Sequence, residues 1–229
     1  MKEKTPAEVG AMKVYALWKK EGDYQYRWRT LLQFGSSWQI IGSVYMKNPG
    51  SAEPLNAEIP KHILDILKKD FSSKDGDWRQ FSEDITMSAI EKLFTECYGK
   101  LNGVIQIFNL FNLKNPKLED AIKILKTDSC TPNHLYTFEE DISYLTHPVY
   151  IGWGDLWKEP VFRPHQKEIN QIFIKSKKLA EEQGKKWYLA NSLADSTNHF
   201  YHPRYVYFHP QTQNMLVQNE KMAFIDMAK

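Results

Sequence analysis

Cysteine is scarce in this 229-residue chain, which contains only Cys97 and Cys130. The two lie far apart and lack the CxxC spacing of redox sites and many metal sites. We therefore expect free thiols in a reducing compartment and assign the protein to the cytoplasm. The first ten residues lack the apolar core of a signal peptide, and no apolar run is long enough to span a membrane. No membrane partner is expected.

Several motifs of nucleotide and hydrolase chemistry are also missing. There is no GxGxxG after a predicted strand and no GxxxxGK[ST] loop, which argues against a dinucleotide site or a P-loop. The GxSxG elbow of an α/β-hydrolase is absent as well. His199 and His202 have a spacing that can ligate a metal, but neither HExxH nor a cysteine cluster accompanies them. We therefore expect no metal and no other cofactor.

Charge of one sign is not in excess, since the formal net charge is +2. A strongly basic protein that binds nucleic acid without specificity finds no support, although a local patch is not excluded. The hydrophobic fraction of 42% and the charged fraction of 25% are typical of a soluble globular protein. We predict one α/β domain over residues 1–229, with a mobile tail at 1–10 and a peripheral C-terminal extension at 205–229.

Short apolar runs alternate with segments of helical spacing along the chain. Apolar runs bounded by turn residues predict strands at 12–18, 24–32, 40–46, 104–110, 145–153 and 187–190, the first two as a hairpin. Helices are predicted after Pro60, from Asp84 or Thr86 to Gly99 or Gly103, and at 116–126 and 164–183. Irregular chain is predicted at 69–80 and 127–137, and an edge hairpin at 205–208 with 215–217. Strands separated by helices favour a three-layer α/β/α domain with a mostly parallel central sheet.

Polar residues follow the ends of these predicted strands. The strand at 40–46 stops in Asn48, Pro49, Gly50 and Ser51, where the proline and the glycine favour a tight turn. Asn109, Phe111 and Lys114 lie at or after the end of the strand at 104–110, Trp153 ends the strand at 145–153, and His202 follows the strand at 187–190. Because ligands bind at the carboxyl ends of the strands in open α/β sheets, we expect these residues to surround one pocket.

The residue types in this set suit a planar, polar ring better than a metal or a phosphate. An asparagine amide offers a donor and an acceptor together, so Asn48 and Asn109 can read the edge of a nucleobase. Phe111 and Trp153 can stack on the ring. The imidazole of His202 can stabilise an anion that develops on it.

Asp84, at the start of a predicted helix, is the carboxylate best placed to hold a water molecule. Each candidate also has a structural interpretation. Asp84 can be an ordinary helix N-cap, Asn109 a strand-end cap, Trp153 a core residue and His202 a satisfied structural histidine. A shared function is favoured because the candidate residues follow the ends of successive predicted strands.

The order of these motifs resembles an uncharacterised bacterial and phage family, domain of unknown function sixteen-forty-three. The resemblance covers roughly Tyr26 to Tyr205 and rests on Tyr26-Arg27 with Leu31, Asn48-Pro49-Gly50-Ser51-Ala52, Asp84-Ile85-Thr86, Asn109-Leu110-Phe111, Trp153-Gly154 and His202-Pro203-Arg204-Tyr205. The chain departs from that family at Gly50, which adds a residue to the first turn, at Lys114, where the family tends to carry arginine, and at Arg204. The family itself implies no established activity.

A more distant similarity is to the uracil-DNA glycosylase superfamily. It implies a glycosylase-like fold and hydrolysis of an N-glycosidic bond. Branches of the superfamily carry an Asn-Pro-Gly turn, a base-reading asparagine at the end of a middle strand, and a late His-Pro motif. By this resemblance Asn48 positions the attacking water, Asn109 reads the base and His202 stabilises the leaving anion.

The sequence therefore predicts a pocket for a nucleobase, a nucleotide or nucleic acid. The hypothesis of a glycosylase-like hydrolase assigns catalysis to Asn48, Asp84 and His202, and substrate binding to Pro49, Gly50, Ser51, Asn109, Phe111, Trp153 and Lys114. Two alternatives stay open: a binding module that senses the same ligand without turnover, and a structural or interaction protein whose polar strand ends hold no ligand. No feature of the sequence indicates the oligomeric state.

Overall fold

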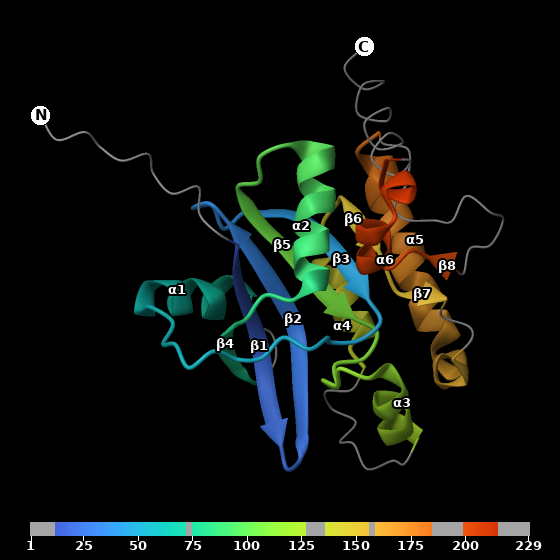
Figure 1. The fold of residues 1–229 in the computed structure, drawn as a ribbon, viewed down its shortest axis with the longest axis horizontal. Coiled ribbons are helices and arrows are strands. Elements are labelled where there is room, and N and C mark those ends of the chain that lie inside the picture. The colour runs from blue at the N-terminus through green and yellow to red at the C-terminus, as the bar shows by residue number, and fades with distance from the viewer. Residues whose placement is uncertain (1–11, 72–74, 127–135, 156–158, 185–198, 215–229) are drawn as a thin grey trace, which may run out of the picture.

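The structure is a computed structural model that describes residues 12–71, 75–126, 136–155, 159–184 and 199–214. Its main feature is a six-stranded sheet in the order β4-β1-β2-β5-β3-β6 (Figure 1). The strands are β1 Lys13–Glu21, β2 Tyr24–Phe34, β3 Ile40–Met46, β4 Asp77–Phe81, β5 Gly103–Asn109 and β6 Val149–Ile151. A separate two-stranded sheet joins β7 Gly154–Asp155 to β8 His199–Phe200.

Helical segments occupy most of the remaining described chain. They are α1 Lys61–Ile66 with the π-helical turn η1 Leu67–Phe71, α2 Ile85–Tyr98, α3 Leu118–Lys126, α4 Phe138–Tyr144, the 3-10 segment η3 Pro160–His165, α5 Gln166–Glu182 and α6 Pro203–Phe208. Within the described ranges, no helix combines the length and the apolar character needed to cross a membrane. The fold is therefore a mixed α/β arrangement around one open sheet.

The prediction of a mostly parallel sheet is wrong. Strand β1 runs antiparallel to both β2 and β4, and β2 runs antiparallel to β5. Among the described strands, only β3 makes parallel pairs, with β5 on one side and β6 on the other. The reason is the connection between strands: a two-residue turn joins β1 to β2 and forces them to be antiparallel, whereas a parallel pair needs a long crossover.

Several predicted boundaries are confirmed, and the errors lie where the local hydrophobic pattern is least regular. The central strand occupies Ile40–Met46 as predicted, and α2 begins after Asp84 and ends before Gly99, whose φ of 78° favours glycine. The loop predicted at 69–80 instead contains β4, which buries Trp78. The chain at 205–208 is part of α6 rather than a strand, and α4 was not predicted. The tail at 1–10, the strand at 187–190 and the partner strand at 215–217 lie outside the described residues.

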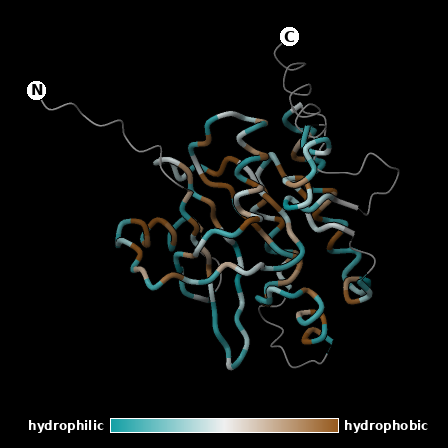
Figure 2. Tube along the Cα trace, viewed as in Figure 1, coloured by the Kyte–Doolittle hydropathy of each residue, from teal (hydrophilic) through white to brown (hydrophobic). Residues whose placement is uncertain are grey.

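Both faces of β3 are buried, because its successive side chains enter different apolar clusters. Val44 and Met46 pack in the cluster that includes α2, whereas Tyr45 packs in the cluster that includes α4 and α5. This explains why β3 reads as a continuous apolar run. In Figure 1, α2 lies in front of the sheet with α6 beside it. Hydrophobic residues gather on the central strands, and the tip of the β1–β2 hairpin is hydrophilic (Figure 2).

A β-bulge in β2 changes which face of the sheet its side chains enter. Ala16 of β1 pairs with Thr30, but Leu17 pairs with Trp28, so Arg29 is an extra residue on β2. An extra residue reverses the alternation of the pleat. As a result Arg27 and Thr30 enter the face that α2 covers, while Trp28 and Arg29 enter the opposite face.

On that opposite face, Asp141 of α4 is the centre of a buried hydrogen-bond network. Its carboxylate accepts from Trp28 Nε1 at 2.7 Å, from Tyr45 Oη at 2.7 Å and from Thr137 Oγ1 at 2.9 Å. Burial raises the pKa of Asp141 to about 7, although these three donors act in the opposite direction. The network ties α4 to strands β2 and β3.

We predict that Asp141→Ala destabilises the protein by roughly 2–5 kcal/mol, because a buried donor left without an acceptor costs about 1–3 kcal/mol. Urea unfolding at pH 7 measures the change. Glu139→Ala, at an exposed position two residues earlier in α4, is the control and should shift the midpoint little. Equal destabilisation by the two substitutions would contradict the network's role.

Candidate ligand pocket

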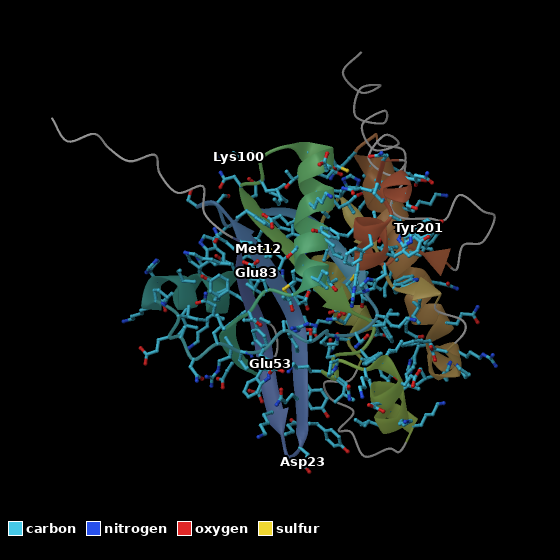
Figure 3. All side chains as sticks on the ribbon, viewed as in Figure 1. Met12, Asp23, Glu53, Glu83, Lys100 and Tyr201 are labelled. Atoms are coloured by element: carbon cyan, nitrogen blue, oxygen red, sulfur yellow. The ribbon has the colours of Figure 1, made fainter. Side chains whose placement is uncertain are left out.

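A cavity of about 210 Å³ opens where the carboxyl ends of β3 and β5 meet the first turn of α2 and the start of α6. Its polar lining comes from Arg27, Thr30, Asn48, Ser51, Asp84, Thr86, Asn109, His202 and Arg204. Figure 3 labels Glu83 and Tyr201, the residues directly before Asp84 and His202, so the α2 and α6 segments can be followed there. The structure thus brings together six of the predicted residues, which are Asn48, Gly50, Ser51, Asp84, Asn109 and His202, from four separate segments.

Parallel pairing of β3 with β5 fixes the positions of the two asparagines. Asn109 is the last residue of β5 and pairs with Met46, the last residue of β3, so Asn48 follows two residues beyond. Asn48 Nδ2 donates to the carbonyl oxygens of Asn115 at 3.2 Å and Pro49 at 3.0 Å, which occupies its donor and leaves Oδ1 as an acceptor. Asn109 is 3% exposed, and its side-chain amide has no hydrogen-bond partner among the described residues.

Asp84 has a structural role and a spare oxygen. Its Oδ1 accepts from the backbone N–H groups of Thr86 at 2.9 Å and Met87 at 3.0 Å, which caps α2 as the sequence predicts. The other oxygen, Oδ2, faces the turn after β3. A Cβ added at Gly50 would lie 2.9 Å from it, so glycine at this position permits the close approach of the turn to Asp84.

His202 is held as a neutral imidazole. Its Nδ1 accepts from Arg204 N at 3.2 Å, which places the proton of the neutral ring on Nε2. Burial lowers the pKa of His202 to about 4, and the charges of Lys47 and Arg204 act in the same direction, whereas Asp84 opposes them. At neutral pH, His202 therefore lines the cavity as a hydrogen-bond donor without charge.

Arg27 and Thr30 are cavity residues that sequence reasoning did not select. Arg27 is 4% exposed. Among the described residues, its Nε has no hydrogen-bond partner and its Nη1 makes only a 3.4 Å contact with the carbonyl oxygen of Ala52. Burial lowers the pKa of Arg27 to about 10, with Asp84 and Glu53 opposing, so the guanidinium stays charged at neutral pH. The sequence singled out Arg27 only within the Tyr26-Arg27 motif, and the bulge at Arg29 decides which face of the sheet its side chain enters.

Phe111 and Trp153 are not at the cavity, which corrects the expectation that they stack on a ligand there. Phe111 is fully buried and its ring stacks on Phe162 at 6.0 Å, and Trp153 meets Tyr45 edge-on at 5.9 Å. Both belong to the apolar cluster that includes α4 and α5. A ring that already packs in the core has no free face for a ligand.

The remaining predicted binding residues divide between the cavity and its surroundings. Gly50 and Ser51 line the cavity, whereas Pro49 is buried beside it and does not. Lys114 also stays outside the lining, because its Nζ forms an ion pair with Glu53 Oε1 at 2.6 Å. Lys114 therefore tethers the chain after β5 to the chain after β3.

Comparison with known proteins adds no relative. No protein-family model matches the chain, and neither a curated protein nor a solved structure matches it.

We predict that Asp84→Ala and Asp84→Asn have different effects on stability. Alanine removes the cap of α2 and should lower the free energy of unfolding by about 0.5–2 kcal/mol, whereas asparagine keeps an acceptor and should cost far less. Urea unfolding of both variants measures the difference. The same loss in both would show that the charge of Asp84, and not its capping bonds, supports the fold.

We predict that His202 makes the protein less stable as pH falls from about 6.5 towards 4. In this window the unfolded chain binds a proton that folded His202 does not, so the free energy of unfolding decreases by up to about 1.4 kcal/mol per pH unit. His202→Asn keeps a capping acceptor but does not titrate, and it should reduce that slope. Unfolding at pH 7, 6 and 5 tests this, with His62→Asn on the exposed face of α1 as the control. An unchanged slope in His202→Asn would refute it.

Proposed function

We propose that the cavity binds a nucleobase, within a nucleotide or nucleic acid, and that the protein hydrolyses its N-glycosidic bond. The observation that carries the proposal is the meeting of Asn48, Asp84, Asn109 and His202 at one cavity. Each comes from a different segment of the chain, and each keeps a polar atom that no described residue occupies. Side chains held in this way are available to a ligand.

The size and the polarity of the cavity support a single base. Its volume of about 210 Å³ is below the 300–1,000 Å³ of sites for drug-sized ligands, so it encloses only a small part of a ligand, such as a base or a phosphate group. The amide of Asn109 offers one donor group and one acceptor, the pattern that a base edge requires. Met46, Met87 and Ile107 supply apolar lining against which the ring faces can lie. Asn109 is therefore the residue we propose for base recognition.

The proposed reaction is attack of water on the anomeric carbon. Oδ2 of Asp84 and Oδ1 of Asn48 are acceptors that can hold the water, and Asp84 takes its proton as the C–O bond forms. The C–N bond breaks, its electron pair goes to the base, and Nε2–H of His202 donates a hydrogen bond to the base as negative charge develops on it. The base then takes up, by way of solvent, the proton that Asp84 received, which restores the Asp84 carboxylate, and the products are the free base and the hydrolysed sugar.

We also propose that the protein is related to the glycosylase superfamily and to domain of unknown function sixteen-forty-three. In support, four of the six motifs that carry the resemblance fall on the carboxyl ends of β3 and β5 and on the starts of α2 and α6. We propose that β5, β3 and β6, with α2 on one face and α4 and α5 on the other, form a distant version of the three-layer glycosylase arrangement. The antiparallel strands β1, β2 and β4 are an addition to it.

A non-catalytic binding module is the second candidate, and one observation favours it. The capping bonds of Asp84 account for that residue without catalysis. Such a module would keep Asn109 and His202 for recognition and would release no base.

The proposal predicts release of free base from at least one substrate in a panel of uracil-containing, mismatched and modified oligonucleotides and the corresponding nucleotides. Free base and abasic sites are the readouts. Asp84→Asn should lower the rate by about 10²–10⁴-fold and preserve binding, because it removes a general base but keeps the cap. Asn109→Ala should weaken binding about tenfold through lost hydrogen bonds.

Asn170→Ala, on the exposed face of α5, is the matched control and should leave rate and binding unchanged. Binding without any base release, lost in Asn109→Ala, would favour the module. Neither binding nor release with any member of the panel would reject both functions.

A further inference from the structure

Two buried arginines at the bulge in β2 enter opposite faces of the sheet, and Arg29 makes more hydrogen bonds than Arg27, although Nε of each has no partner among the described residues. Arg29 donates from Nη2 to Gln106 Oε1 at 2.8 Å and from Nη1 to the carbonyl oxygen of Phe71 at 3.1 Å, and its guanidinium lies over the ring of Tyr144. Arg27 has only the 3.4 Å contact with Ala52 and a position over the ring of Phe81. Within the described part of the chain, no carboxylate lies within 4.0 Å of Arg27.

A buried cation without a counter-ion is costly, and proteins pair such groups or use them. Arg27 differs from a merely structural arginine in its position, since it lines the cavity together with Thr30 and Asn109. Thr30 Oγ1 is also buried and has no hydrogen-bond partner in the described part of the chain. We call Arg27, Thr30 and Asn109 the inner end of the cavity, because all three are less than 5% exposed.

The inner end offers mainly donors to a ligand. Guanidinium groups donate and never accept, the threonine hydroxyl can donate, and the asparagine amide has two N–H groups. The complementary ligand group is therefore one that only accepts and carries negative charge. Carboxylates and phosphates have this chemistry, and the planar fork of arginine binds either in a bidentate manner.

The charges around the cavity favour an anion. Arg27 and Arg204 line it, whereas Asp84 is the one acidic residue among its described lining. One oxygen of Asp84 is occupied by the amides of α2, which offset part of its charge. Lys47 adds a further positive charge near His202, where it helps to lower the pKa of that imidazole.

We propose that the inner end of the cavity is an oxyanion site, in which Arg27 and Thr30 bind the phosphate or carboxylate group of the ligand. The site stands on Arg27 and does not depend on hydrolysis. Joined to the proposed function, it favours a free nucleotide with a terminal phosphate over a base within a duplex, because a terminal phosphate carries about −1.5 to −2 charge near neutral pH and a phosphodiester carries less. The ligand class is then a nucleoside monophosphate.

Isothermal titration of the full chain with inorganic phosphate, and with acetate at the same ionic strength, tests the site. The variants are Arg27→Gln and Thr30→Val, and Arg79→Gln on the outer strand β4 is the matched control. We expect phosphate to bind the wild type and Arg79→Gln alike. Its affinity should fall at least tenfold in Arg27→Gln and about three- to tenfold in Thr30→Val. Acetate binding in place of phosphate would identify a carboxylate as the ligand group.

A second arm compares a nucleoside 5′-monophosphate with the same nucleoside. The monophosphate should bind the wild type at least tenfold more tightly, and Arg27→Gln should remove this advantage. If Arg27→Gln fails to fold, Thr30→Val and Arg27→Lys test the site in its place. Lysine keeps the charge but loses the bidentate fork, so Arg27→Lys should still weaken phosphate binding.

The oxyanion site is refuted if neither anion binds, or if both bind the inner-end variants as tightly as the wild type. The outcome separates this site from the proposed hydrolysis. Phosphate binding that depends on Arg27, without base release from any substrate, supports the site and rejects the hydrolase. Base release that Arg27→Gln leaves intact, without binding of either anion, supports the hydrolase and rejects the site.

Discussion

The parallel pairing of β3 with β5 is the constraint on which the candidate site depends. It places Asn109 opposite Met46, so the chains that leave both strands do so side by side. The backbone continues this pairing past the strand ends, where Leu110 N donates to the carbonyl oxygen of Met46 at 2.9 Å. In an antiparallel pair these two ends would lie at opposite edges of the sheet. The first turn of α2 then closes the space above them.

The bulge at Arg29 is the second constraint, and it assigns two neighbouring cations to different environments. Without the extra residue, Arg27 and Arg29 would enter the same face of the sheet. With it, Arg29 joins the network of Gln106 and Ser43, whereas Arg27 reaches the cavity under α2. Because of this one inserted residue, Arg27 lines the cavity instead of packing beside Arg29 on the opposite face of the sheet.

Local sequence was sufficient for features that rest on local chemistry. The limits of β3 and the capping of α2 by Asp84 follow from an apolar run and a capping residue, and the structure has both. The relative direction of the strands could not be predicted from local sequence, because it depends on how connections of different length cross the sheet. The roles of Arg27 and Phe111 were missed for a related reason: a bulge and a burial pattern decide them, and neither has a signature in one sequence.

The network around Asp141 and the cavity lie on opposite faces of the same strand, β3. Tyr45 is fixed by its hydrogen bond to Asp141 on one face of β3, and the next residue, Met46, lines the cavity on the other face. On β5, Gln106 donates to Ser43 Oγ at 2.8 Å and so ties the two strands together through their side chains as well. A fully bonded buried network has few alternative arrangements. The polar groups behind the sheet therefore fix the side chains of β3 and β5 on that face, next to the residues that line the cavity on the other face.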